Sequence, residues 1–294
     1  MTPFICTCIV TAGWLLADNS TGYPNGRLLI EPGELAQRMS DKDLIILDCR
    51  TQEKYRTSHI PQARWVDVSA WSKAFGNGSD TEGWAKRLGE LGLRPDAEIV
   101  IYDDSKSVAA ARVWWILRYW SFTNVRLLNG GWVAWQAANL PSSTQPTSAP
   151  APTTVQLQPK REVLAVKDQV LECLSKPSCQ IVDARSEDEF CGKTKLSKRG
   201  GAMPGAKHLE WSDLLDEKTH RFKSAEEIRR LFAKAGIDLD KPTVAHCQSG
   251  GRSSVMAFAL ELMGAKNVQN YYAGWAEWGN AEDTPIVTPP SGSK

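Results

Sequence analysis

The stretch TVAHCQSGGRSS, residues 243–254, places a cysteine, two glycines and an arginine directly after a short apolar run. We predict a strand over 242–246, because this run is typical of a buried strand. The next residues, VMAFALELM (255–263), are apolar on almost every side and end at Gly264, which predicts a buried helix over about 253–263. A glycine-containing turn between a strand and a helix directs backbone N–H groups inward, and such a turn binds anions.

The chain contains this type of unit twice. The matching segments are LIILDCR (44–50) with CQIVDAR (179–185), IPQA (60–63) with MPGA (203–206), and LLNGGWVAW (127–135) with YYAGWAEW (271–278). A stretch rich in Pro, Ser and Thr, typical of an extended linker, separates the two halves. The pattern predicts an α/β protein whose domains each have a mainly parallel central sheet flanked by helices. We assign residues 1–143 to the first domain, 144–160 to the linker and 161–294 to the second domain.

The two halves differ at the cysteine. Asp103 follows the helix-ending Gly92 by eleven residues, and Cys247 follows Gly236 by the same number. The aspartate is followed by DSKSVAAAR (104–112), which has no glycine. The second half also carries about eight additional residues, within 191–202, and these residues include four cations: Lys193, Lys195, Lys198 and Arg199. We therefore expect the chemistry in the second half.

Cys247 has two interpretations. A lone cysteine at a strand end is more often a small buried hydrophobe than a reactive group. If the anion held by the loop is the cysteine's own sulfur, however, the thiolate is favoured and becomes a nucleophile at neutral pH. Gly250 and Gly251 permit the backbone angles of such a loop, and Arg252 adds positive charge. The combination favours a functional cysteine.

The pattern Cys-x4-Arg-Ser, taken with DAR (183–185), MPGA and GWAEW (274–278), resembles the rhodanese family of sulfurtransferases. The likeness covers residues 28–285 as a tandem of two rhodanese-like domains. It implies an inactive first domain, with Asp103 in place of the cysteine. It also implies an enzyme in which Cys247 takes the outer sulfur of thiosulfate, releases sulfite and passes its persulfide sulfur to cyanide or to a thiol or dithiol such as thioredoxin. The family needs no metal or organic cofactor.

The resemblance also indicates the site residues. The catalytic residue is Cys247, and the predicted substrate-binding residues are Gln248, Ser249, Gly250, Gly251, Arg252 and, from the added segment, Arg199. Asp183 and Arg185 are expected to brace a turn, because the first half repeats them as Asp48 and Arg50. Trp275, Trp278 and His246 are expected to serve packing.

Three other functions stay open. A 3-mercaptopyruvate sulfurtransferase would share Ser249 and Gly250, but such relatives have an arginine at the position of Glu189, and an uncompensated carboxylate there would repel that substrate. A cysteine phosphatase has five residues between its cysteine and arginine, whereas four separate Cys247 from Arg252. The third alternative is a non-catalytic sulfur-binding module.

Composition excludes other classes. The net charge of +1 gives no general attraction to nucleic acid. Seven cysteines without a CxxC pair argue against a disulfide framework or a zinc site and favour the cytoplasm. The apolar first seventeen residues lack a basic start and are too short to span a bilayer, so we expect no stable membrane insertion. Export is the alternative if they form a signal.

Overall fold

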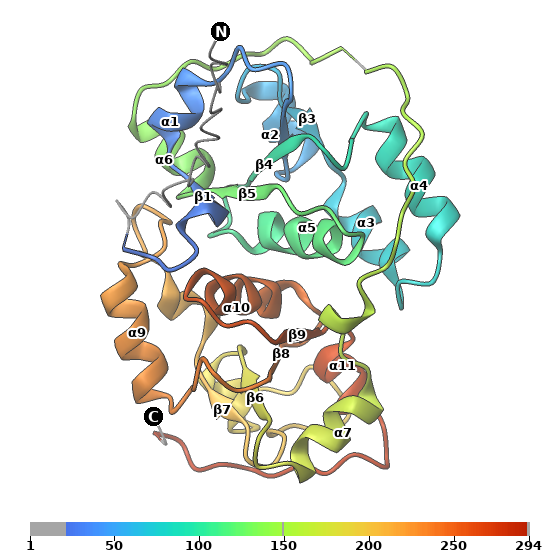
Figure 1. Ribbon diagram of the computed structural model, residues 1–294. Helices are drawn as coiled ribbons and strands as arrows, with labels where there is room; N and C mark the ends of the chain where they lie inside the picture. Colours follow the sequence, from blue (N-terminus) through green and yellow to red (C-terminus); the bar gives the residue numbers. More distant parts are fainter. Residues whose placement is uncertain (1–21, 149, 293–294) are drawn as a thin grey trace, which may run out of the picture.

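Two parallel β-sheets, one in each half of the chain, form the centre of the computed structural model, which describes residues 22–148 and 150–292 (Figure 1). The first sheet has the order β1-β5-β4-β2-β3, with β1 (Leu29–Ile30), β2 (Leu44–Asp48), β3 (Arg64–Trp65), β4 (Glu98–Tyr102) and β5 (Val125–Leu128). The second has the order β7-β6-β8-β9, with β6 (Gln180–Asp183), β7 (Lys207–His208), β8 (Thr243–His246) and β9 (Val268–Tyr271). The predicted α/β fold with parallel sheets is confirmed.

Helices flank both sheets. Those of the first domain are α1 (Pro32–Gln37), α2 (Gln52–Thr57), α3 (Val68–Phe75), α4 (Thr81–Glu90), α5 (Val108–Tyr119) and α6 (Gly131–Ala137). Those of the second are α7 (Lys167–Ser175), α8 (Glu187–Phe190), α9 (Ala225–Lys234), α10 (Gly251–Leu262) and α11 (Gly274–Trp278). Helix α10 begins two residues before the predicted start, because the left-handed conformation of Gly250 (φ 85°) turns the chain directly into the helix.

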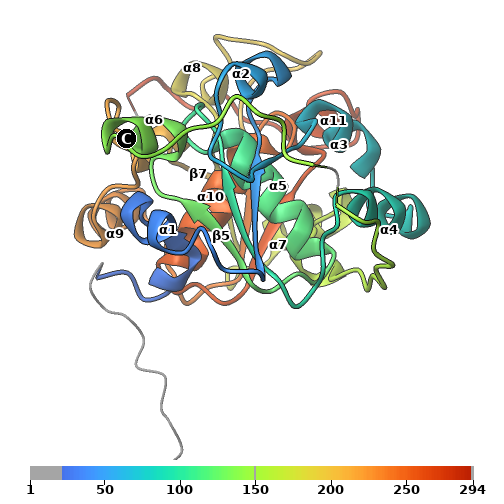
Figure 2. The ribbon, with the colours of Figure 1, turned by 90° about the horizontal axis from the view of Figure 1, so that it is seen from above.

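Helices α5 and α10 lie next to each other in the middle of the molecule, between the two sheets (Figures 1 and 2). One hydrophobic cluster includes residues of both helices and extends into both domains. Within it the rings of Trp114 and Phe258 pack edge to face at 4.9 Å. Because α10 follows the cysteine loop directly, this packing brings the loop to the first domain.

The described residues of the segment 144–160 form no helix or strand, and they run along the first domain, on the right-hand side of Figure 1. The N–H of Thr153 donates to the carbonyl of Gly89 at 3.1 Å, and the N–H of Lys160 donates to the carbonyl of Tyr119 at 2.6 Å. A side chain on Gly89 would collide with the carbonyl of Thr153, so the segment lies close against α4. The domain boundaries given above stay a prediction.

Cys173 and Cys179 form a disulfide, which corrects the expectation that the cysteines stay reduced. They flank the turn between α7 and β6, and this turn brings their Cα atoms to 5.3 Å, within the range of a disulfide. A spacing of six residues is no recognised motif, so the pattern gave no sign of the pair. Cys49, Cys191 and Cys247 are free and buried.

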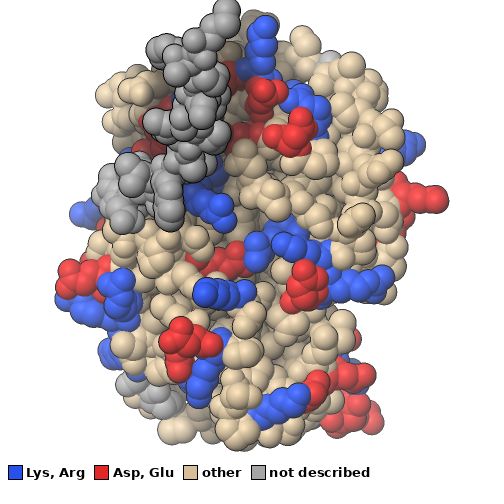
Figure 3. Space-filling model, viewed as in Figure 1, with Lys and Arg blue, Asp and Glu red and all other residues tan. Residues whose placement is uncertain are grey.

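The described residues contain no helix with the length and apolar character needed to cross a membrane. The apolar stretch 1–17 lies outside the described residues. On the face shown in Figure 3, Lys and Arg side chains are interspersed with Asp and Glu, in keeping with the small net charge.

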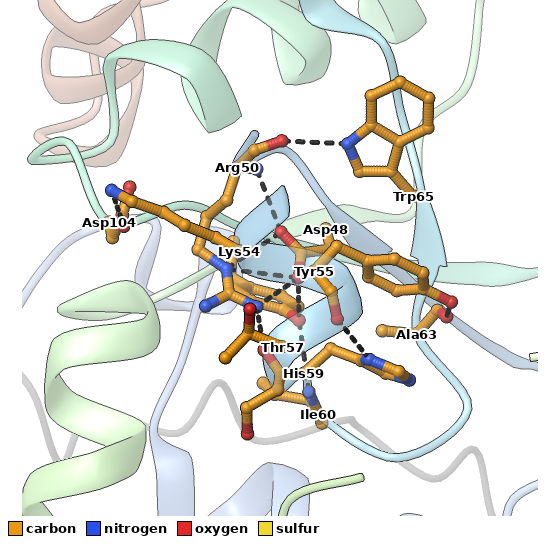
Figure 4. A network of polar contacts seen from close by, with 12 residues as sticks. Asp48, Arg50, Lys54, Tyr55, Thr57, His59, Ile60, Ala63, Trp65 and Asp104 are labelled. Carbon is orange, nitrogen blue, oxygen red and sulfur yellow. Dashed lines mark hydrogen bonds and ion pairs between the residues drawn. The ribbon is translucent and has the colours of Figure 1, made fainter. Parts of the chain in front are cut away.

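The repeated Asp-x-Arg pairs brace a turn in each domain, as expected. Asp48 accepts hydrogen bonds from the backbone and side-chain nitrogens of Arg50 at 2.6–3.1 Å (Figure 4). Asp183 and Arg185 repeat this arrangement at 2.6–3.1 Å. Each guanidinium also donates to a loop carbonyl, that of Ser58 in the first domain and that of Gly201 in the second. These pairs are structural.

His246 and two tryptophans serve packing, as expected. Trp275 and Trp278 are fully buried. His246 Nε2 lies 3.4 Å from Asp183 Oδ2. Burial lowers the pKa of His246 to about 4, although the charge of Asp183 opposes this effect. The ring is therefore neutral at pH 7.

Candidate active site

The loop that starts at Cys247 is held by hydrogen bonds to its carbonyl groups. The four carbonyls of residues 247–250 accept N–H groups, in order, from Trp275 (2.8 Å), Ala276 (2.9 Å), Arg112 Nη1 (2.9 Å) and Ser254 (3.1 Å). The C=O and N–H of a planar trans peptide point in opposite directions, so the amides of residues 248–251 point away from these four donors. Among the described residues, the amides of 248–253 have no nitrogen or oxygen acceptor. The loop therefore presents a set of unpaired donors.

The first domain shows which ligand a loop of this kind accepts. The buried Asp103 carboxylate receives backbone N–H groups from Ser105 (3.1 Å), Ser107 (2.9 Å), Ala109 (2.8 Å) and Ala110 (3.0 Å), together with the hydroxyl of Ser105 (3.0 Å). Burial nevertheless raises the pKa of Asp103, and the amides offset only part of this effect. In the first domain the loop thus surrounds its own anion, at the position where the second domain has a sulfur.

Cys247 is 1% exposed, and its Sγ lies 3.4 Å from the hydroxyl oxygen of Ser253. The same hydroxyl lies 2.7 Å from Asn270 Oδ1. A hydroxyl has one proton to donate, so Ser253 serves one of these two acceptors at a time. Beside a neutral thiol the proton goes to Asn270; beside a thiolate it can turn to the sulfur. Ser253 can therefore follow the charge of Cys247.

Asn270, on β9, connects the loop to the first turn of α10. Its Nδ2 donates to Ser254 Oγ at 3.0 Å and to the Gly250 carbonyl at 3.3 Å, and the Ser254 hydroxyl donates to the same carbonyl at 2.7 Å. We call Ser253, Ser254 and Asn270 the polar triad; all three are fully buried. Strand register and the helix starts give its counterparts in the first domain as Ala110, Ala111 and Leu127.

The sequence prediction missed the polar triad. The apolar counterparts in the first half were the signal that could have revealed it, because a buried polar group present in one copy alone needs a reason.

Arg252 was predicted to bind substrate, but its guanidinium forms two hydrogen bonds with the carboxylate of Glu189, at 2.5 and 2.8 Å. Burial raises the pKa of Glu189, but the hydrogen bonds and charge of Arg252 outweigh it, and the pKa lies below its ordinary value. The premise that Glu189 is uncompensated is therefore wrong. The negative charge of Glu189 also neutralises the positive charge of Arg252, the charged side chain of residues 247–252.

The two glycines of the loop are needed for space. A Cβ on Gly250 would lie 2.5 Å from the ring of Tyr272, and a Cβ on Gly251 would lie 2.5 Å from Arg112 Nη2. Gly250 also has a positive φ of 85°, which side chains rarely adopt. The loop is thus enclosed on its outer side by residues of both domains.

The added segment contacts the loop through Gln248, whose Nε2 donates to the Leu196 carbonyl at 3.3 Å and to Ser197 Oγ at 3.2 Å. Lys193, Lys195 and Lys198 are exposed, and Lys193 lies 3.6 Å from Asp188.

Arg199 requires a correction, because its guanidinium donates to carbonyls of the segment 278–284, including that of Thr284 at 3.0 Å, and to the Thr284 hydroxyl. These hydrogen bonds join the C-terminal segment to the domain and occupy the guanidinium.

Residues 31–138 and 166–281 each match the family model described as the rhodanese-like domain. The chain belongs to the rhodanese family. A thiosulfate sulfurtransferase of Azotobacter vinelandii is 35% identical to this rhodanese over 263 residues, which cover 88% of this chain and 96% of the relative. The sulfur carrier protein TtuD of Thermus thermophilus is 32% identical over 282 residues, 90% of this chain and 98% of the relative.

Solved structures similar to this chain include those of SseA and EanB. SseA of Escherichia coli, whose structure is described as showing the rhodanese fold and mechanism of 3-mercaptopyruvate sulfotransferases, is 27% identical with a TM-score of 0.75, over 84% of this chain and 98% of SseA. Wild-type EanB is 24% identical with a TM-score of 0.80, over 90% of this chain and 70% of EanB, and this likeness concerns the fold alone.

Proposed function

We propose that this rhodanese is a thiosulfate sulfurtransferase that uses Cys247 as its nucleophile. The observation that carries the proposal is the orientation of the N–H groups of residues 248–251. The carbonyls of the same four peptides, those of residues 247–250, are all hydrogen-bonded, and the N–H groups point in the opposite direction. Preorganised N–H donors stabilise an anion without rearranging during the reaction. The names of the relatives from Azotobacter and Pseudomonas aeruginosa, both thiosulfate sulfurtransferases, support thiosulfate as the donor.

The proposed reaction has two displacement steps. The Cys247 thiolate attacks the outer sulfur of thiosulfate; a new S–S bond forms, the old S–S bond breaks, and its electron pair leaves with sulfite. The Cys247 persulfide is again an anion, so the same amides serve both enzyme forms. A thiophilic acceptor then attacks the outer sulfur of the persulfide and restores the thiolate. Cyanide would leave as thiocyanate. A dithiol such as thioredoxin would leave as a persulfide, and attack of its second thiol on the inner sulfur of that persulfide would close a disulfide and release hydrogen sulfide.

The contacts of Arg252 favour sulfur chemistry over phosphate chemistry. A phosphatase loop uses its arginine to bind the phosphate oxygens. Here both terminal nitrogens of Arg252 donate to Glu189, which leaves the loop with backbone donors. These donors suit one anionic sulfur atom.

The main alternative donor is 3-mercaptopyruvate, which is favoured by the likeness to SseA. Its carboxylate would need a cation at the loop, and Arg252 already pairs with Glu189. Turnover of thiosulfate and of 3-mercaptopyruvate measured side by side distinguishes the two.

The cellular location stays a prediction. Within the described part of the chain, three free cysteines favour the cytoplasm, whereas the Cys173–Cys179 disulfide is more typical of an oxidising compartment.

Intact mass spectrometry tests the persulfide. The reduced, folded protein is incubated with thiosulfate, and we expect its mass to increase by one sulfur atom. Cyanide should remove the added mass. The Cys247→Ala variant should never acquire it, whereas Cys191→Ala, which changes another free cysteine, should behave as wild type. A wild-type mass that stays unchanged would refute the proposal and leave the non-catalytic binding module as the better interpretation.

A further inference from the structure

The cysteine loop is also held by a residue of the first domain, Arg112 on α5. Its Nη1 lies within hydrogen-bond distance of three acceptors: the Ser249 carbonyl (2.9 Å), the Tyr272 hydroxyl (2.8 Å) and Ser72 Oγ (2.9 Å). Its guanidinium carbon lies 5.3 Å from the centre of the Tyr272 ring. Among the residues described, it has no carboxylate partner, in contrast to Arg252.

The space for Arg112 is created by Gly251. A Cβ at this position would lie 2.5 Å from Arg112 Nη2. The φ of Gly251 is not positive, so its backbone conformation is open to any residue. The absence of a side chain at position 251 is therefore explained by the guanidinium of the other domain.

Arg112 controls one peptide plane of the loop. Of the four carbonyls at 247–250, three are held by donors of the second domain, and that of Ser249 is held by Arg112. Fixing this carbonyl on the outer side fixes the Gly250 N–H on the inner side, because the two groups of a trans peptide point in opposite directions. Without Arg112 the Ser249–Gly250 peptide, next to a flexible glycine, is free to rotate.

We infer that Arg112 is a positioning residue for the sulfur transfer, through which the inactive first domain completes the amide set of the second. The inference rests on the proposed function of Cys247. It assigns the first domain a part in catalysis through the orientation of a single peptide, besides its part in packing.

A purely structural interface contact is the alternative, and the chain offers a matched control for it. Arg118 lies on the same helix, six residues further on, and also reaches α10 of the second domain. Its Nε lies 2.9 Å from Glu261 Oε1, far along α10 from the loop. Arg112→Ala and Arg118→Ala therefore each remove an arginine side chain from the same interface. Only Arg112→Ala also removes a hydrogen bond to the cysteine loop.

The first measurement is the rate of Cys247 alkylation by iodoacetamide as a function of pH, which requires no turnover. Arg112→Ala should slow alkylation at neutral pH about tenfold and move the midpoint of the pH profile upward, because the thiolate loses an aligned donor. Arg112→Lys should restore part of the rate. Arg118→Ala should keep the wild-type profile. The other charged or titratable groups around the loop are the same in all variants: Arg252, Glu189, Asp183, His246 and Tyr272.

Gly251→Ala tests the inference without changing Arg112. Its methyl group would displace the guanidinium, so the variant should reproduce the slower alkylation of Arg112→Ala. In the double variant the two effects should not add, because both remove the same contact. Additive effects would contradict the inference, and so would a Gly251→Ala variant with the wild-type rate. This arm also remains informative if Arg112→Ala fails to fold.

The kcat/KM for thiosulfate is measured on the same variants. Arg112→Ala should lower it about ten- to a hundredfold relative to Arg118→Ala at similar thermal stability. Equal alkylation profiles and equal kcat/KM for the two variants would refute the role of Arg112. A wild-type protein without thiosulfate turnover would refute the proposed function instead, and the alkylation profiles would still decide on Arg112.

Discussion

Asn270→Leu tests whether the polar triad forms one unit. The substitution gives the second domain the residue that occupies the same register position in the first domain, Leu127. It removes the hydrogen bonds from Asn270 Nδ2 to Ser254 and Gly250, and the bond that Asn270 Oδ1 accepts from Ser253. All of these atoms are buried.

The magnitude follows from the bonds lost. A buried hydrogen bond contributes about 1 kcal/mol, and a buried group left without its partner costs about 1–3 kcal/mol. Three bonds are lost, but Ser254 keeps the Gly250 carbonyl as an acceptor. We therefore expect Asn270→Leu to lower the free energy of unfolding by about 3 kcal/mol. The side chains differ little in size, so the cavity contribution is small.

The triple variant Ser253→Ala, Ser254→Ala, Asn270→Leu gives all three positions of the polar triad the residues found in the first domain. Replacing both partners of a buried hydrogen bond by apolar groups costs far less than removing one. The triple variant should therefore recover about half or more of the stability lost by the single one. It should still lose at least about tenfold in sulfur transfer, because Ser253 no longer donates to the sulfur of Cys247.

Urea unfolding followed by tryptophan fluorescence compares the wild-type, single and triple proteins, and thiosulfate–cyanide turnover gives their activities. The free energy of unfolding should be highest for the wild type, lower for the triple variant and lowest for the single variant. A triple variant less stable than the single one would refute the view of the triad as one unit. Full activity in the triple variant would refute the role of Ser253.

Burial raises the pKa of Glu261 to about 7 despite the nearby charge of Arg118, so its contribution to stability is present below its ordinary pKa and is lost as the pH rises to about 7. By calorimetry, the thermal midpoint of Glu261→Gln relative to wild type should rise between about pH 5 and pH 8, and a constant difference would contradict this. Gly274→Ala, with a φ of +60° and a Cβ that would collide with the Cys247 carbonyl, should cost about 2 kcal/mol and reduce activity. Gly131→Ala, its counterpart at Asp103, should cost as much and leave activity intact; equal loss of activity in both would contradict the reasoning.

The fold was predictable because it depends on local sequence patterns that occur in both halves of the chain. Apolar strands, capped helices and the buried run after Cys247 each restrict the local structure, and their repetition defines the domains. The Asp183–Arg185 brace was predictable for the same reason, since the first half has it as well, as Asp48–Arg50. Cys247 followed from the comparison of the halves, because Asp103 replaces it.

The remainder of the site depends on contacts between distant segments. Glu189 and Arg252 are 63 residues apart, and Arg112 and Ser249 are 137 apart, so neither pairing leaves a local pattern. Arg199 was misplaced because closeness in sequence to the MPGA turn was taken as closeness to substrate. Its hydrogen bonds are with Thr284 and its neighbours, 85 residues away along the chain.

The packing of α10 has a consequence for separating the two domains. Every residue of this helix except Arg252 is buried. The second sheet covers one side of α10, and α5 of the first domain covers the other. A second domain severed at the linker would expose this helix to water and aggregate. The first domain, with Asp103 in place of the cysteine, therefore still covers the central helix of the second domain. The two domains thus share one hydrophobic cluster, and separating them would expose it.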